Sequence, residues 1–231
     1  MAPPDRLKTR FSSRRLKNLV DKLDEQQKGF VIKNDFASLL RISTFNVPTS
    51  FLEWVMKNID VSSAEFNHND KSFKLSSQIV KQVLGIPSRS TPLNLSSVSE
   101  DVKAEVEKII PVYKVCGPHK SNIDNAVALC AADHNEDSFF SSFMMVAITS
   151  VLCPSTQNSL DFEYLNFLMD AGSVKTFDWA DHIIKQILSS VRKYQGYIQS
   201  FKDDCQSGSH YFAGCLPLLA VSFFQIHVCS F

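Results

Sequence analysis

Glycine and proline are scarce in this chain, whose 231 residues include only 7 Gly and 9 Pro. This scarcity excludes collagen-like and Gly/Pro-rich low-complexity proteins, and it also argues against a turn-dense all-β protein. Disorder throughout the chain is excluded too, because 44% of the residues are hydrophobic and 18 are Phe. The composition therefore predicts a mostly helical globular protein made of one domain or two small ones.

Apolar runs long enough to cross a membrane are also missing. The two longest, Phe139 to Cys153 and Phe212 to Val228, cover 15 and 17 residues, whereas a spanning helix needs roughly 20. The first contains serines and a threonine, and the second contains Pro217, Gln225 and His227. We expect both to be buried core helices.

The sequence shows no secretory signal and no CxxC pair among its six cysteines. Without a signal, reduced thiols are expected rather than a disulfide framework. The glycosylation sequon at Asn94 then has no meaning, and the chain is interpreted as intracellular.

No motif for catalysis or phosphate binding is present: there is no Walker loop, GxGxxG, GxSxG or HExxH. The nearest pairs to a metal site are Cys116 with His119 and Cys130 with His134, so we expect no metal and no cofactor. The loop around Cys205 leaves a cysteine hydrolase open as an alternative. Cys215 lies in an apolar run and is expected to be a buried hydrophobe.

Charge is balanced overall but not along the chain. The 24 basic and 24 acidic residues cancel, yet residues 1–20 hold six bases against one acid, a net charge of +5. Such an arm predicts either nucleic-acid contact or a nuclear-import address, with a solvated first helix and a frayed leader as the alternative. The candidate nucleic-acid-binding residues are Arg6, Lys8, Arg10, Arg14, Arg15 and Lys17, and the body is expected to contribute little.

Hydrophobic periodicity predicts a helix from residue 13, with Gly29 as its C-terminal stop. Pro48 is expected to open another helix. Residues 65–75, in which Phe and Leu flank an Asn/Asp turn, predict a small β-hairpin.

Further along, Ser76 is expected to cap a short helix that ends at Gly85. An acidic helix begins near Ser99, and Pro111 is expected to break it. The segment from Glu136 to Leu152 predicts a central helix buried on all sides. The clearest amphipathic helix covers residues 178–201, and its apolar stripe consists of Trp179, Ile183, Ile187, Val191, Tyr194 and Ile198.

These elements predict a mainly α, irregular multi-helix globular fold with one small β-hairpin. The expected organisation is a disordered basic leader (1–12), an N-terminal helical part with the hairpin (13–87), a loop or linker (88–97) and a C-terminal helical part (98–231). The two helical parts are expected to pack together as one domain.

Several short motifs also resemble, in order, a family found in plant transposon-derived proteins. They are Phe51 to Asp60, Val80 to Pro87, Phe143 to Ala147, Leu152 to Thr156, Val174 to Trp179, Arg192 to Gln195, Gly214 to Leu216 and Leu219 to Val221. The family is the helical module found upstream of ubiquitin-like-protease domains, related to the plant mobile domain (aminotransferase-like) family. Ser88-Arg89-Ser90 and Ala213 stand where the family usually has glycines.

The resemblance implies a nuclear module of transposon origin without a characterised activity, and we expect the protease domain that commonly follows in the family to be absent. We expect a non-enzymatic protein that binds nucleic acid or an import receptor through its basic arm, or a protein partner. No membrane and no small molecule are expected. The alternatives are a cytoplasmic location, a cryptic cysteine hydrolase, and a truncated product without function.

Overall fold

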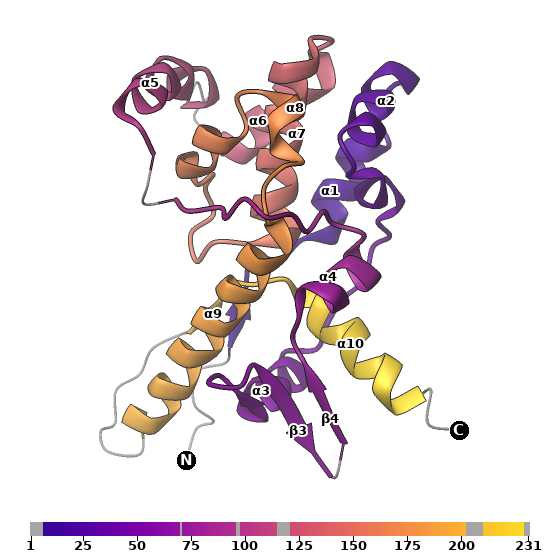
Figure 1. The fold of residues 1–231 in the computed structure, drawn as a ribbon, viewed down its shortest axis with the longest axis vertical. Helices are drawn as coiled ribbons and strands as arrows, with labels where there is room; N and C mark the ends of the chain where they lie inside the picture. The colour runs from indigo at the N-terminus through magenta and orange to yellow at the C-terminus, as the bar shows by residue number, and fades with distance from the viewer. Residues whose placement is uncertain (1–6, 70, 96–97, 115–120, 202–209, 229–231) are drawn as a thin grey trace.

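A computed structural model describes residues 7–69, 71–95, 98–114, 121–201 and 210–228 (Figure 1). The predicted fold class is confirmed: the described chain is mainly helical, with small strands between the helices. The α-helices are α1 (Ser13–Val20), α2 (Glu25–Lys33), α3 (Thr49–Lys57), α4 (Ser77–Leu84), α5 (Glu100–Lys114), α6 (Asn122–Ala132), α7 (Glu136–Ala147), α8 (Ala171–Val174), α9 (Trp179–Phe201) and α10 (Leu216–Val228). Two 3₁₀-helices, η1 (Ala37–Arg41) and η3 (Phe162–Phe167), and a π-helix, η2 (Ile148–Leu152), complete the helical elements.

The predicted hairpin is present as β3 (Glu65–His68) and β4 (Lys71–Lys74), and β2 (Ile59–Asp60) adds a third antiparallel strand. Phe66 lies opposite Phe73 in the register, and their rings stack 5.1 Å apart on the buried face. A second, two-stranded ladder joins β1 (Lys8–Thr9) in parallel to β5 (Tyr211–Phe212). The sequence did not predict this ladder.

The buried central helix is confirmed as α7 with η2, since every residue from Phe139 to Leu152 is buried. It packs closely against α6 and also contacts α2, α8, η3, α1 and α10. In the described part of the chain, no helix combines the length and apolarity needed to cross a bilayer.

The amphipathic helix is confirmed as α9, which at 23 residues is about 34 Å long. Trp179, Ile183, Ile187 and Val191 are all completely buried. The indole Nε1 of Trp179 donates to the carbonyl of Val174 at 2.8 Å, so the polar edge of this large side chain is satisfied inside the core.

Figure 1 shows how α9 connects two regions of the fold: α1, α2 and α5–α8 above, and α3, β2–β4 and α10 below. Each region combines elements from residues 13–87 with elements from residues 98–231, so the spatial division does not follow the division expected along the chain. The loop after α4 is fixed to α9, because the carbonyl of Thr91 accepts from the amide of Asp178 at 2.7 Å.

The expectation that residues 1–12 form a disordered leader is wrong for residues 7–12; residues 1–6 lie outside the described chain. Leu7 is only 2% exposed and belongs to the core, and Lys8 and Thr9 form β1. The amide of Ser12 donates to the carbonyl of Ser150 at 2.8 Å, which fixes the approach to α1. Pairing with distant parts of the chain, which composition does not report, orders this segment.

Two expected helix ends are also wrong. Gly29 lies inside α2, because Asp24 and Gln27 form a capping box that starts a new helix before it. Pro111 lies inside α5 at an exposed position, where the N–H that proline lacks costs the helix one backbone hydrogen bond without ending it. Gly85 does end α4 as expected, with a left-handed φ of 60°.

Ile187→Ala is expected to lower the free energy of unfolding by about 2–5 kcal/mol, through lost burial and the cavity left in a packed core. Chemical denaturation measures the change. Gln199→Ala, an exposed substitution on the same helix, is the control and should change stability by less than about 0.5 kcal/mol. An unchanged midpoint for Ile187→Ala would contradict the burial of this stripe.

Lowering the pH is expected to weaken the fold through His182, which is 5% exposed and shares a 2.8 Å hydrogen bond with the Tyr164 hydroxyl. Burial lowers the pKa of His182 from 6.5 to about 4. The unfolded chain therefore takes up this proton near pH 6.5, before the folded chain does. His182 contributes its full stabilisation above pH 6.5, and the contribution falls by up to about 3 kcal/mol towards pH 4.

Denaturation at a series of pH values checks this expectation by comparing the protein with His182→Gln, which keeps a hydrogen-bonding partner for Tyr164. The stability advantage of the unsubstituted protein should shrink as the pH falls from 7 to 4. Gln199→Ala, at an exposed position without a titratable side chain, should follow the unsubstituted protein throughout. Parallel pH curves for His182→Gln and the unsubstituted protein would contradict the assignment.

Candidate nucleic-acid interface

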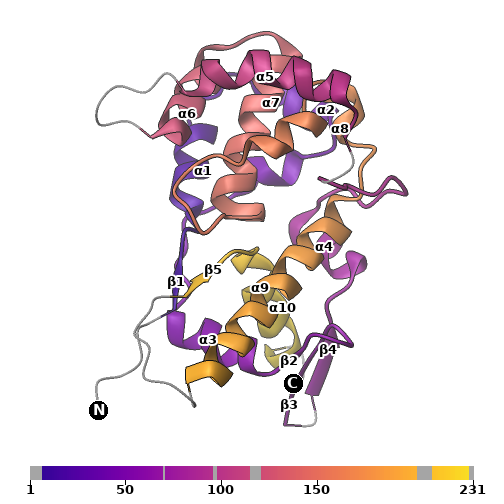
Figure 2. The same cartoon turned by 90° about the vertical axis from the view of Figure 1, so that its left-hand side faces the viewer.

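The basic segment, residues 8–17, begins in a strand that is paired with the rest of the fold. Lys8 and Thr9 pair with Tyr211 and Phe212, and the Lys8 amide donates to the carbonyl of His210 at 2.8 Å. Figure 2 shows β1 and β5 side by side, with α9 next to them and α1 continuing from β1. The base-rich segment therefore lies against the surface formed by β5 and α9.

Arg10 and Lys8 both approach the ring of Tyr211. The guanidinium carbon of Arg10 lies 4.7 Å from the ring centroid, and Nη2 donates to the Tyr211 hydroxyl at 3.3 Å. The Lys8 ammonium lies 6.0 Å from the same centroid. Cation–π contact orients two of the candidate bases around one aromatic side chain.

The other candidate bases differ in availability. Arg6 lies outside the described residues. Arg14 is exposed on α1 and forms no ion pair with another described residue. Arg15 is half-buried, and burial lowers its pKa, while Lys17 forms an ion pair with Asp21. Of the three bases on α1, Arg14 is the one that faces solvent without a carboxylate partner.

A cleft of about 260 Å³ lies between α9 and β5. Its lining consists of Thr156, Gln186, Ser189, Ser190, Lys193, His210, Tyr211 and Ala213. We call it the α9–β5 cleft. Lys193 is exposed and, like Arg14, has no ion-pair partner among the described residues. Tyr211 lines this cleft, and its ring also contacts the guanidinium group of Arg10. Lys193 in the lining and Arg10 beside it are therefore parts of one surface.

A short contact holds β5 against α9. The amide of Ala213 donates to the hydroxyl of Ser190 at 2.8 Å. At Gly214, a Cβ atom would lie 2.7 Å from the ring of Phe212 and 3.1 Å from Ile187, so this position requires glycine. A larger residue here would displace the Phe212 ring, which is completely buried.

His210 is the histidine in the wall of this cleft. Its ring lies 5.6 Å from that of Tyr194 and 5.3 Å from that of Tyr197, and its Nε2 is buried without a hydrogen-bond partner among the described residues. Burial, and after it the charge of Lys193, lower the pKa of His210 below its ordinary value. A neutral imidazole beside a lysine is the resulting state near pH 7.

A second cleft, of about 370 Å³, lies where the segment enters α1. Phe11, Ser12, Ser13, Arg14, Thr44, Phe45 and Asn46 line it. We call it the α1 cleft. The rings of Phe11 and Phe45 lie 5.2 Å apart in its wall, so this cleft also combines aromatic side chains with a base.

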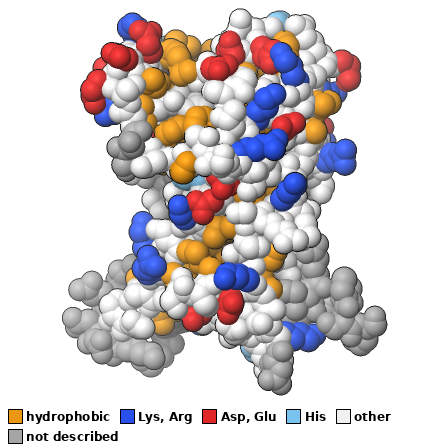
Figure 3. All heavy atoms as spheres, viewed as in Figure 1, with side chains coloured by type: hydrophobic (Ala, Val, Ile, Leu, Met, Phe, Trp, Pro, Cys, Tyr) orange, Lys and Arg blue, Asp and Glu red, His pale blue; other side chains and the backbone are white. Residues whose placement is uncertain are grey.

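We refer to Lys8, Arg10, Arg14 and Lys193 together as the basic surface. None of the described residues that line either cleft is acidic. In Figure 3, Asp and Glu side chains gather over α5 at the upper left, whereas Lys and Arg side chains lie along the left edge over α9. Lysines accompany the acids on α5, where Lys103 is paired with Glu100 and Lys108 with Glu105.

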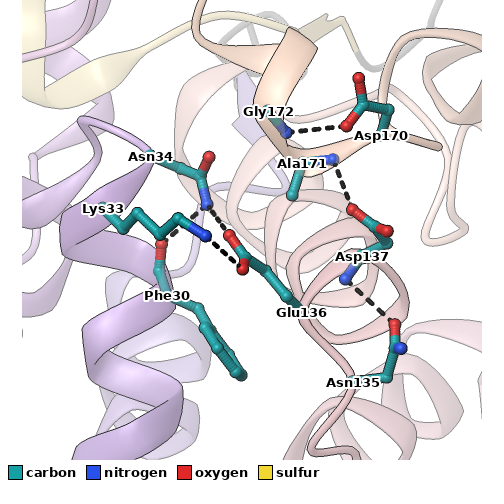
Figure 4. Close-up of polar contacts among 9 residues, drawn as sticks. All are labelled: Phe30, Lys33, Asn34, Asn135, Glu136, Asp137, Asp170, Ala171 and Gly172. Carbon is teal, nitrogen blue, oxygen red and sulfur yellow. Dashed lines mark hydrogen bonds and ion pairs between the residues drawn. The ribbon is translucent and has the colours of Figure 1, made fainter.

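Another polar cluster joins α2, α7 and α8, and its groups are already paired (Figure 4). Glu136 accepts from Lys33 at 2.6 Å and from Asn34 at 3.1 Å, and these contacts keep its pKa below the usual range. Asp137 accepts from the amide of Ala171 at 2.9 Å. Because partners occupy these carboxylates, we interpret the cluster as a structural junction.

The described cysteines are poorly suited to nucleophilic chemistry. Cys130, Cys153 and Cys215 are all buried, and burial raises the pKa of each thiol, to about 12 for Cys215. These thiols are protonated at neutral pH, and the thiolate is the reactive form. Cys205 lies outside the described residues.

The residues considered for a zinc site do not converge in the described chain. Cys116 and His119 lie outside it, Cys130 is buried, and His134 is exposed beside Asp24. Over the described ranges, no group of three or more His, Cys, Asp or Glu side chains has the arrangement to hold a metal ion.

A family model described as "Domain of unknown function (DUF8566)" matches residues 9–220. The match covers most of the chain, so the protein belongs to this family. The search of curated proteins found no match. The search of solved structures found none either.

The sequence predicts candidate site residues in the basic segment alone and does not indicate Lys193, His210 or Tyr211. The available signal was the Arg192-Lys193 pair on the polar face of a strongly amphipathic helix. Nothing in the local sequence indicates that this face lies beside residues 8–14.

Lys193→Gln is expected to raise the pKa of His210 toward its ordinary value of 6.5, because the substitution removes the positive charge that disfavours the imidazolium. An NMR titration of the histidine ring protons measures the shift. Lys185→Gln is the control: Lys185 lies on the same helix and is ion-paired with Asp181, so His210 should not respond to it. An unchanged pKa of His210 in Lys193→Gln would show that the charge of Lys193 does not act on His210.

Proposed function

We propose that this chain is a non-enzymatic, nuclear module of transposon origin that binds nucleic acid through the basic surface. The observation that carries the proposal is that four cations from two distant segments line or flank two clefts that have no acidic lining residue. Phosphate oxygens are the natural partners of such a surface, since Lys and Arg neutralise them and release counterions.

The aromatic side chains in the two clefts favour binding that does not depend on the base sequence of the nucleic acid. Phe11 and Phe45 line the α1 cleft, and Tyr211 lines the α9–β5 cleft, each beside a base. Aromatic rings contribute stacking that does not depend on base identity, and phosphate contacts carry no sequence information. Weak, non-specific binding follows, with a dissociation constant on the order of 10⁻⁴–10⁻⁶ M near physiological salt.

The fold also bears on the import-address interpretation, which reads the same charges as an extended peptide. Arg10 lies on Tyr211, Arg15 is half-buried, and Lys17 is paired with Asp21. An import receptor would have to remove these side chains from the folded protein. This favours nucleic acid as the partner of the folded protein.

One carboxylate lies near the basic surface. Glu53 on α3 accepts from the amide of Leu7 at 3.4 Å, at the edge where the segment begins. Its negative charge is expected to limit binding at the Lys8 end, so Arg14 and Lys193 are the better positions to test. Removing the segment by truncation is unsuitable, because it would also remove the buried Leu7 and Leu16.

Arg14→Gln and Lys193→Gln are each expected to weaken binding of labelled oligonucleotides of unrelated sequence, measured by fluorescence anisotropy at several salt concentrations. Each lost phosphate contact should reduce the slope of log K against log salt by about 0.9 on duplex DNA and by about 0.7 on single strands. Affinity should fall by a similar factor for every sequence.

Lys81→Gln provides the matched control, because Lys81 is exposed on α4 and lies outside both clefts. It should leave the affinity and the salt slope unchanged. If the unsubstituted protein does not bind even at low salt, the basic surface does not bind nucleic acid and the import address gains support. Equal losses in all three variants would show a diffuse charge effect instead of a site.

A further inference from the structure

The α9–β5 cleft has polar features that contact with a nucleic-acid backbone alone does not require. It is a recess of about 260 Å³ lined on several sides by hydrogen-bonding side chains. Thr156, Ser189 and Gln186 contribute hydroxyls and an amide, and Lys193 contributes an ammonium group with three donors.

His210 adds the second observation. It lines the cleft, and its Nε2 is buried without a partner in the described chain, an arrangement that a folded protein normally avoids. Arg10 stands next to the cleft on the ring of Tyr211, and its Nε is likewise buried without a described partner. His210 and Lys193 therefore line one recess, and Arg10 lies beside it on the ring of Tyr211.

We propose that the α9–β5 cleft binds a phosphomonoester group, with Lys193 and His210 as its principal contacts. This inference rests on the proposed function only in so far as the group belongs to a nucleic-acid end. A phosphomonoester carries nearly two negative charges at pH 7 and three strong acceptor oxygens, whereas a backbone phosphodiester carries one charge. The converging donors and the absence of a carboxylate in the described lining fit the more highly charged group.

The same chemistry has two sources, the phosphorylated end of an oligonucleotide and a small phosphorylated molecule. The probes are therefore one single-stranded oligonucleotide with either a 5′-phosphate or a 5′-hydroxyl, together with adenosine 5′-monophosphate, adenosine and inorganic phosphate. We expect the 5′-phosphate to bind about tenfold more tightly than the 5′-hydroxyl, as charge-assisted hydrogen bonds to one added group would give.

Variants separate the cleft from the rest of the basic surface. Lys193→Gln and His210→Gln should abolish the preference for the 5′-phosphate. Arg14→Gln, in the α1 cleft, should weaken both oligonucleotides equally and keep the preference. His210 also packs against the rings of Tyr194 and Tyr197, so its substitution could disturb the fold. Circular dichroism of each variant is therefore the control for folding.

An NMR titration of the unsubstituted protein gives a readout that needs no variant. Inorganic phosphate and adenosine 5′-monophosphate should shift the ring signals of His210 and raise its pKa, because a bound anion favours the imidazolium. The groups that face His210 are Lys193 on α9, Tyr194 and Tyr197 on the same helix, and Tyr211 in β5. Adenosine should have no effect.

The outcomes distinguish the two proposals. If oligonucleotides bind with a salt dependence but show no end preference and no response of His210, the phosphomonoester site is refuted and the proposed function stands. If His210 responds to phosphate and to the mononucleotide while neither oligonucleotide binds, the site stands and takes a small molecule, and the proposed function fails. A 5′-phosphate preference that persists in both cleft variants would place the contact elsewhere and overturn the site.

Discussion

Burial of α7 and η2 on every side is the constraint on which the remaining structure depends. A helix without a solvent face needs neighbours all round it, and α1, α2, α6, α8, η3 and α10 supply them. Two of its hydroxyls are bonded inside the protein: Ser141 donates to the carbonyl of Leu168, and Ser142 lies 2.9 Å from the Tyr113 hydroxyl. The buried hydroxyl of Ser150 in η2 has no hydrogen-bond partner among the described residues. The central helix therefore sets both the number of surrounding helices and the polar contacts they must make.

The candidate site is a consequence of how that core continues outward. The stripe of α9 fixes which side of this helix is buried, so Lys193 and Gln186 are directed toward the cleft beside β5. Phe212 of β5 is completely buried in the core, and this burial fixes the position of β5. Because β1 pairs with β5, it also fixes the position of β1. Hydrophobic burial therefore determines where the basic segment lies, and with it where the charged side chains of the segment are placed on the surface.

The sequence predicted the elements whose signals are local. The stripe of α9, the uniformly apolar α7, the hairpin and the cap at Gly85 are each visible in a window of a few residues, and each is present. The periodicity predicted one helix from residue 13 to Gly29, whereas the chain forms two, α1 and α2. The apolar period continues through Asp24, but the capping box at this residue starts a new helix there.

Half of the candidate site was visible in the same way. The base-rich segment is a local signal, whereas the β1–β5 ladder consists of two residue pairs between very short strands. No periodicity marks strands of that length, so nothing connected Lys193, His210 or Tyr211 to the segment. Long-range pairing of this kind is decided by the shape of the core.

The same ladder sets an order of events during synthesis. Lys8 leaves the ribosome early, yet its partner Tyr211 is made about 200 residues later, which at 5–20 residues per second is a delay of roughly 10–40 s. During that interval the base-rich segment has no strand to pair with. The segment of residues 1–20, with its net charge of +5, therefore meets the polyanionic surface of the ribosome before it pairs with β5 in the folded protein.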